Sequence, residues 1–204
     1  MASKPAVPPG VALRGNSAAR SRFRGRAAPW TTYHDVARMN DSHITLRPAT
    51  DADYVFMRRL YESARAEEME RFPFDDAQKK VFLDQQFAAQ FEHYGIHYPT
   101  CERNIVEQNG VPVGRLWIDE WRDQIRIVDI GLLPECRGKG IGSRLLHEVL
   151  DRGSASGKPV TIHVEAFNPA LRLYQRLGFE KVDTNGVYFL MRWTPPQVKT
   201  ASSA

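Results

Sequence analysis

A glycine-rich turn between Leu132 and Ser143 holds the residues of this sequence that are best suited to chemistry. The segment reads LLPECRGKGIGS and joins a run with strand-like alternation to a run with helical spacing. Alternating glycines allow backbone N–H groups to converge, and the N-terminus of a helix adds positive potential. Arg137 and Lys139 add positive charge beside these groups. The turn therefore predicts a site for a phosphate or pyrophosphate group.

Two common phosphate-binding patterns do not describe this turn. The P-loop pattern G-x-x-x-x-G-K-[ST] is absent from the sequence. The dinucleotide pattern G-x-G-x-x-G also fails, because in a pattern that starts at Gly138 the third glycine comes one residue early. When the pattern starts at Gly140, its last position is Leu145. The turn thus predicts a phosphate site of another kind.

A second motif follows the turn at a fixed distance along the chain. It reads N-P-A-x-x-x-Y-x-x-x-G-F from Asn168 to Phe179, after R-x-x-G-x-G from Arg137. With both motifs in this order, the sequence resembles the GNAT superfamily of acyl-CoA-dependent N-acetyltransferases. The resemblance covers about residues 43–194 and is strongest over residues 127–179.

The resemblance implies acetyl-CoA as co-substrate and no metal. In this family, backbone amides of the loop after the fourth strand hold the CoA pyrophosphate. The fourth strand splays from the fifth, and the pantetheine arm inserts between them. Asn168 would contact the pantetheine or cap its helix. The contacts implied by the resemblance are Leu132, Leu133, Arg137, Gly138, Lys139, Gly140, Ile141, Gly142, Ser143 and Asn168.

The resemblance also implies catalytic roles. A backbone N–H at Leu132 would polarise the thioester carbonyl, and Tyr174 would return a proton to the leaving thiolate. A phenol with a pKa of about 10 is suited to that task. For the general base we name Glu165, at the end of the fifth strand, with Asp129 and Glu120 as open alternatives.

The acceptor is indicated only by charge. Residues 62–76 contain six acidic side chains against two arginines, and in the resembled family the first two helices wall the acceptor site. Acidic groups there would attract a cationic amine, with Phe72, Phe74 and Tyr94 as lining; a solvated helix face is the alternative. The acceptor class stays open between a small-molecule amine and a peptide amine.

The secondary structure expected around these motifs alternates strands and helices. Strands are predicted over residues 43–48, 103–108, 111–120, 124–133, 159–166, 181–183 and 187–193, and helices over 52–65, 76–93, 141–152 and between 168 and 178. The order predicts an α/β fold of the α+β, GNAT-like kind. We expect a mixed, mostly antiparallel sheet of about seven strands, flanked by about four helices, with a V-shaped splay between strands four and five.

Composition and charge divide the chain of 204 residues into a domain and tails. Residues 1–42 hold seven Lys and Arg against two Asp, a charge of +5, whereas the remainder carries −1. Basicity therefore belongs to the N-terminal segment, and we expect no specific nucleic-acid binding. The predicted division is a basic, disordered tail over 1–42, the N-acetyltransferase domain over 43–194, and a short polar tail over 195–204.

Several function classes are excluded or left open. No apolar run approaches the roughly 18 residues of a membrane span, so we expect no membrane association. Two cysteines, Cys101 and Cys136, are too few for a disulfide framework, which favours a cytoplasmic protein. The resembled family allows a monomer or a homodimer. An active N-acetyltransferase is the first hypothesis, and a CoA-binding regulatory or degenerate domain without turnover is the alternative.

Overall fold

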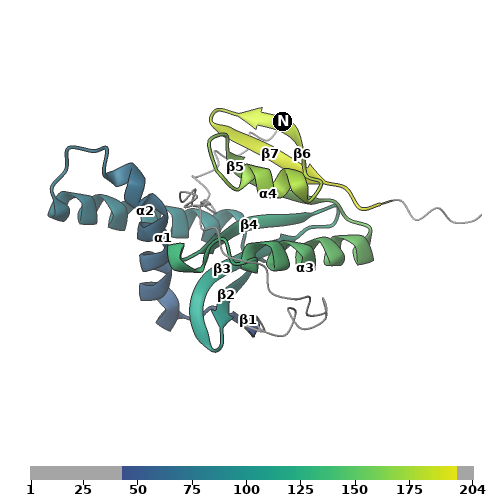
Figure 1. Ribbon diagram of the computed structural model, residues 1–204, viewed down its shortest axis with the longest axis horizontal. Helices are drawn as coiled ribbons and strands as arrows, with labels where there is room; N and C mark the ends of the chain where they lie inside the picture. The colour runs from purple at the N-terminus through teal and green to yellow at the C-terminus, as the bar shows by residue number, and fades with distance from the viewer. Residues whose placement is uncertain (1–42, 197–204) are drawn as a thin grey trace, which may run out of the picture.

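Seven strands and four α-helices make up residues 43–196, the part of the chain that the computed structural model describes (Figure 1). The predicted fold class is therefore confirmed. The strands are β1 (Ile44–Pro48), β2 (Glu102–Gln108), β3 (Val111–Glu120), β4 (Ile125–Leu132), β5 (Val160–Glu165), β6 (Glu180–Asn185) and β7 (Tyr188–Trp193). The helices are α1 (Tyr54–Met69), α2 (Asp76–His97), α3 (Ile141–Ser156) and α4 (Leu171–Arg176), with short 3-10 turns η2 (Asp51–Asp53) and η3 (Pro134–Cys136).

The strands form a single sheet in the order β1-β2-β3-β4-β5-β7-β6. Every neighbouring pair is antiparallel except β4 and β5. That parallel pair joins only residues 125–127 to residues 160–162, although both strands continue beyond. Figure 1 shows the two strands diverging from this point, so the predicted splay is present.

The turn between β2 and β3 follows from its sequence. Asn109 and Gly110 both adopt positive φ angles, 54° and 78°. An Asn-Gly pair with this geometry matches the right-handed twist of two antiparallel strands. The Asn109 side chain also accepts a hydrogen bond of 3.0 Å from the backbone N–H of His43, so the turn supports the start of β1 as well.

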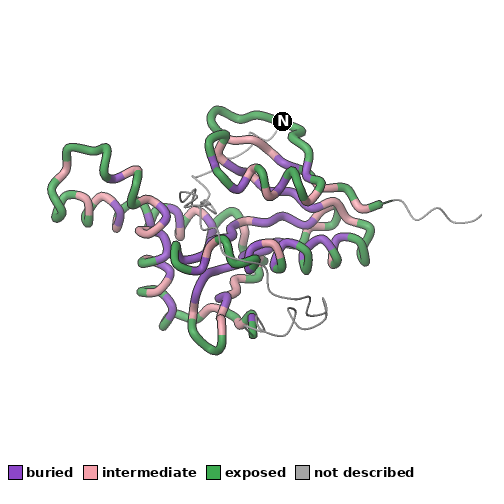
Figure 2. Tube along the Cα trace, in the orientation of Figure 1, coloured by how far each residue is buried: buried purple, intermediate pink, exposed green. Residues whose placement is uncertain are grey.

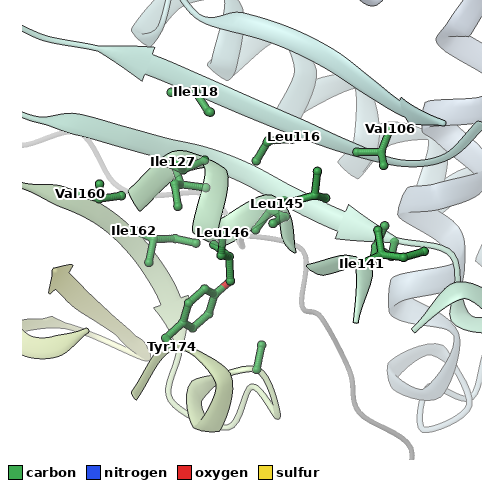
Figure 3. Packing of buried hydrophobic residues seen from close by; sticks show 14 of the residues in the cluster. Val106, Leu116, Ile118, Ile127, Ile141, Leu145, Leu146, Val160, Ile162 and Tyr174 are labelled. Atoms are coloured by element: carbon green, nitrogen blue, oxygen red, sulfur yellow. The ribbon is translucent and has the colours of Figure 1, made fainter. Parts of the chain in front are cut away.

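Apolar side chains form one core on each face of the sheet. Leu116 and Ile118 of β3 belong to the core shared with α3 and α4, part of which is shown in Figure 3. Trp117 lies between them in sequence and packs on the opposite face against α1 and α2. In Figure 2 the buried segments follow β3, β4 and the inner sides of the helices, whereas β6 is exposed along its length.

The predicted end of α3 at residue 152 is wrong, because the helix continues through Gly153 to Ser156. A Cβ on Gly153 would lie 2.9 Å from Val160 Cγ2 and 3.1 Å from the Trp193 ring. Gly153 therefore allows α3 to approach β5 and β7. The helix ends at Gly157, which has a φ of 66° as a C-terminal capping glycine.

The predicted domain over residues 43–194 stays a prediction; within the described residues, the first strand begins at Ile44 and the last ends at Trp193. The tail predictions for 1–42 and for most of 195–204 lie outside the described residues and stay predictions. Among the described residues, no helix combines the length and the apolar character needed to cross a membrane.

Gly114 of β3 provides a test of how closely β3 and β4 must approach. A Cβ at Gly114 would lie 2.3 Å from the Gly131 carbonyl oxygen and 2.6 Å from Leu132 Cδ2. We expect Gly114→Ala to lower the free energy of unfolding by at least about 2 kcal/mol, because backbone must move. Urea denaturation measures this loss.

Gly95→Ala is the matched control. Gly95 lies in α2, where a new Cβ would come no closer than 3.9 Å to another group, the Arg103 side chain. This variant should gain roughly 0.4–1 kcal/mol, since alanine restricts the unfolded chain. Equal stability changes for the two variants would contradict the close approach.

Candidate active site

The glycine-rich turn leads directly into the N-terminus of α3. Gly138 and Gly140 have φ angles of 73° and 85°, which place both in the left-handed region that glycine favours. A Cβ on either residue would meet no heavy atom within 4 Å, so space is open in front of the loop. The first N–H groups of an α-helix have no acceptor within the helix. The turn therefore presents backbone donors and the positive end of α3 to open space.

A pocket of about 370 Å³ lies at this point, between the turn, the end of β4 and α4. Six residues that the sequence predicted as CoA contacts line it together: Leu132, Arg137, Gly138, Gly140, Gly142 and Ser143. Of these six, Ser143 is half-buried. Three other predicted contacts do not line the pocket: Lys139 is exposed to solvent, and Leu133 and Ile141 are buried in the core. A loop with converging amides, open space and nearby Arg and Lys fits a pyrophosphate group.

The end of β4 directs backbone groups toward the splay. Leu133 N–H donates to the Val113 carbonyl across the β3 side at 2.9 Å. Because successive N–H groups of a strand point to opposite sides, the N–H of Leu132 faces away from β3, toward β5. The Leu132 carbonyl accepts a 2.8 Å hydrogen bond from Arg137 Nε. The structure thus leaves Leu132 N–H on the side expected for carbonyl polarisation.

The opposite wall of the pocket comes from α4. Four lining residues on or just before this helix were not among the predicted contacts: Pro169, Ala170, Leu173 and Arg176. The last three are three residues apart, which places them on one helical face, so periodicity could have indicated them. Arg176 adds a third positive side chain to Arg137 and Lys139.

Asn168 has a different position from its neighbours. It is buried, and its Oδ1 accepts a 2.9 Å hydrogen bond from the Ala170 N–H. The α4 helix begins at Leu171, so Asn168 organises the turn that precedes it. The residue at the N-cap of α4 is Ala170, and its side chain makes no capping bond, so the Asn168 bond closes the turn before the helix. Pantetheine binding by Asn168 stays a prediction.

Tyr174 lies on α4 and is buried, with 1% of its surface exposed. Its ring meets Phe179 edge to face at 5.6 Å, and it points from α4 toward Leu146 of α3 (Figure 3). Burial, together with the negative charge of Asp129, raises the pKa of the Tyr174 phenol above its ordinary value. The phenol therefore keeps its proton over the whole neutral range.

The three candidate bases occupy very different surroundings. Glu165 is half-buried at the end of β5, within hydrogen-bonding reach of the Tyr188 hydroxyl on β7. Glu120 is on the surface, bound to Arg152 at 2.5 Å and to Lys158 at 2.8 Å, and these partners lower its pKa. A carboxylate held by two cations and facing solvent is a poor base, so Glu120 is disfavoured.

Asp129 is fully buried beside the place where β4 changes register against β3. One carboxylate oxygen accepts a 2.5 Å hydrogen bond from Arg115, whose guanidinium is itself buried. Burial raises the pKa of Asp129, and the charge of Arg115 opposes the shift. Tyr94 of α2 lies within hydrogen-bonding reach of the same carboxylate. Asp129 thus connects β3, β4 and α2 in the interior.

Only part of the acidic stretch over residues 62–76 lies near the candidate site. Arg65 forms an ion pair with Glu68 at 3.2 Å. The charges of both residues act on the pKa of the Tyr188 hydroxyl beside Glu165, which Arg65 lowers and Glu68 raises. Glu62 instead pairs with Arg58. Phe72 and Phe74 stack on each other at 5.5 Å and pack on Phe82 of α2, and Tyr94 is buried in the core. The structure does not bring these three aromatic residues together as a lining.

No three His, Cys, Asp or Glu side chains of residues 43–196 gather in a way that could hold a metal ion. The prediction that no metal takes part is not tested by this observation and stays a prediction.

Comparison with known proteins identifies the class. The sequence profile described as the Acetyltransferase (GNAT) family matches residues 57–179. The match spans more than half of the chain, and the protein belongs to the GNAT family of acetyltransferases. PaiA N-acetyltransferase from Thermoplasma acidophilum, solved with coenzyme A, has a TM-score of 0.58 at 16% identity, covering 74% of this chain and 98% of that one. This likeness shows the fold.

Curated relatives share shorter segments. L-amino acid N-acyltransferase MnaT of Escherichia coli is 35% identical over 82 residues, which cover 37% of this chain and 48% of that protein. N-alpha-acetyltransferase RimI of Mycobacterium tuberculosis is 43% identical over 61 residues, covering 29% and 37%. The matched segments span between 6% and 48% of the relatives' own lengths.

The Arg115–Asp129 pair generates a prediction about stability and pH. Arg115→Met would leave a buried carboxylate without its cation, and we expect the free energy of unfolding at neutral pH to fall by about 3–5 kcal/mol. The variant raises the folded-state pKa of Asp129 further, so the folded state holds a proton more tightly than the unfolded state. The loss should therefore be small at acid pH and grow as pH rises.

Guanidinium denaturation at several pH values measures both effects. The double variant Arg115→Met/Asp129→Leu is the control, since an apolar pair removes the unpaired charge and should recover most of the stability. A loss that is independent of pH, or no recovery in the double variant, would contradict the role of this pair.

Proposed function

We propose that the protein transfers an acetyl group from acetyl-CoA to a primary amine by direct attack of the amine. The observation that carries the proposal is the pocket in which the α3 N-terminus, the glycine-rich turn and the splayed end of β4 meet. When bound, acetyl-CoA supplies an activated acetyl thioester. The coenzyme A complex of the T. acidophilum structure supports this choice of co-substrate.

Binding is assigned to the turn and to α4. Backbone N–H groups from Gly138 to Ser143 would hold the pyrophosphate, with charge from Arg137, Lys139 and Arg176. Leu132 N–H would stabilise the negative charge that develops on the carbonyl oxygen. These are the roles that the positions of the groups allow, and the variants below test them.

Proton transfer is assigned to Tyr174 and Glu165. The phenol of Tyr174 is protonated at neutral pH and would donate to the thiolate as it leaves. Glu165 would take the proton of the attacking amine, directly or through water, with Tyr188 holding the carboxylate in place. The amine must arrive neutral at the carbonyl carbon, since only its lone pair can attack.

Replacing Tyr174 by Phe tests the acid. We expect kcat to fall about 100-fold, because the thiolate then leaves without a proton donor. The KM for acetyl-CoA should stay within about twofold, since the ring and its packing remain. In the wild type, the rate should not decline on the alkaline side below about pH 10, because burial raises the Tyr174 pKa above its ordinary value.

Thiol release from acetyl-CoA is the measurement, with a panel of amino acids, polyamines, aminoglycosides and peptides as acceptors. Tyr54→Phe, a change on the exposed side of α1, is the matched control. An unchanged kcat in Tyr174→Phe would remove the acid role. Acetyl-CoA binding without release against every acceptor would favour the alternative, a CoA-binding domain without turnover.

Gly140→Ala tests the binding loop. A side chain at a φ of 85° is strained by about 1–2 kcal/mol, and the loop must shift to relieve it. We expect the Kd for acetyl-CoA, measured by calorimetry, to rise about tenfold. Gly157→Ala carries similar strain, at a φ of 66°, but lies at the other end of α3. Equal weakening by the two variants would place the binding loop elsewhere.

A further inference from the structure

Arg126 of β4 is a buried cation on the face of the sheet opposite to α3. Its neighbours Ile125 and Ile127 belong to the core under α3, so strand alternation places Arg126 on the other face. Only 7% of its surface is exposed. Nη1 lies 3.2 Å from Nδ1 of His163 on β5, and the guanidinium carbon lies 5.4 Å from the centre of the Trp121 ring.

The described part of the chain provides no counter-ion for this charge. Within residues 43–196 Arg126 makes no ion pair, and its buried Nε has no hydrogen-bond partner. Asp119 is opposite Arg126 in the β3–β4 register, but its two oxygens accept from Thr100 Oγ1 and Trp121 Nε1, both at 2.7 Å. Burial lowers the pKa of Arg126, and the positive charge of Arg192 acts in the same direction, whereas Tyr98 opposes the shift.

The partner that Arg126 does have is a neutral acceptor. A guanidinium carries only donors, so Nδ1 of His163 must accept and the ring proton must lie on Nε2. A neutral imidazole and an indole face compensate a buried charge far less than a carboxylate does. Arg115, the other buried arginine with its guanidinium in the interior, has Asp129 at 2.5 Å. Arg126 thus differs from Arg115 in having no counter-ion among the described residues.

The strand register places this cation on the same face of the sheet as the proposed base Glu165, which lies four residues beyond the residue opposite Arg126. Arg126 is opposite Thr161 of β5, which is opposite Arg192 of β7, so three strands contribute to one row on this face. His163 and Glu165 follow on the same face of β5, at steps of about 6.6 Å per two residues. Arg126, His163 and the proposed base Glu165 therefore lie in that order along one face of the sheet.

We propose that Arg126 binds a carboxylate of the acceptor, so that the acceptor is an amine that also carries a free carboxylate, as an amino acid or short peptide does. This inference rests on the proposed function and names its acceptor class. With the anion at the guanidinium beside His163, the amine reaches toward Glu165 about one two-residue step away. Bidentate donation to a carboxylate is the geometry for which a guanidinium is best suited.

The first experiment compares acceptors that differ only in the carboxylate: L-lysine with L-lysinamide, and glycylglycine with glycylglycinamide. The full chain should show at least about tenfold higher kcat/KM for the acid of the preferred pair. Arg126→Met should abolish this preference while the KM for acetyl-CoA stays unchanged. Arg122→Met, which removes an exposed charge from the turn before β4, should retain it. A larger preference in the lysine pair would indicate a free amino acid as acceptor, and a larger preference in the glycylglycine pair would indicate a peptide.

A wild type without preference, or a preference that survives Arg126→Met, overturns the proposal. A second experiment is independent of turnover and uses N-acetylglycylglycine and its C-terminal amide, which have no amine to acetylate. Calorimetry should show that the acid binds the full chain at least about tenfold more tightly than the amide, and that Arg126→Met removes the difference. Equal binding of both, or binding of neither, overturns the anion site even where acetyl transfer itself is confirmed.

Thermal unfolding separates this role from a structural one. Replacing an unpaired buried cation by an apolar side chain of similar length should leave Tm unchanged or raise it. A Tm that falls by more than about 4 °C in Arg126→Met would show that the guanidinium stabilises the fold, and would count against a ligand site. Absence of acetyl transfer to every acceptor, with the acid still bound through Arg126, would instead contradict the proposed function alone.

Discussion

The early end of the β4–β5 pairing is the constraint on which the site depends. The two parallel strands share only three residue pairs, Ile125 to Ile127 with Val160 to Ile162. Beyond them, β4 still has backbone groups that point toward β5, and buried backbone groups need partners. Arg137 already supplies a donor to one of them, the Leu132 carbonyl. An extended ligand with its own amides can satisfy others, as an added strand does.

The separation of the strands is supported from the opposite side of β4. The β3–β4 register shifts next to Trp117 and Ile118, and the Asp129 carboxylate is held there by Arg115. This pair attaches the shifted part of β4 to β3 and α2, while β5 continues with β7. The Arg115–Asp129 pair thus holds the shifted part of β4 on the β3 side, and the pocket lies at the end of β4, where β4 and β5 are no longer paired.

Turns that depend on one or two neighbouring residues were predicted correctly from the sequence. Asn109-Gly110 closes the β2–β3 hairpin, and Gly138 and Gly140 of the turn before α3 have positive φ angles, as residues in a tight turn can. The wall formed by α4 was not predicted, because the spacing of Ala170, Leu173 and Arg176 marks one helical face but not the element that this face meets. The end of α3 was predicted too early because Gly153, the residue after the predicted helix, is required by contacts with β5 and Trp193 and not by the end of the helix.

Charged residues on the strands show most clearly what a sequence cannot provide. Glu120, Asp129 and Glu165 were equivalent as strand carboxylates, and only burial and partners separate a surface ion pair, an interior support and a candidate base. The same holds for two arginines on neighbouring strands. Arg115 has its counter-ion inside the fold, whereas Arg126 is also buried but has none among the described residues. A fold that needs only stability has no use for the second arrangement, since an apolar side chain would serve it better. The proposed acceptor, bound on the face of the sheet that carries Arg126 and Glu165, would supply the counter-ion that the described residues lack.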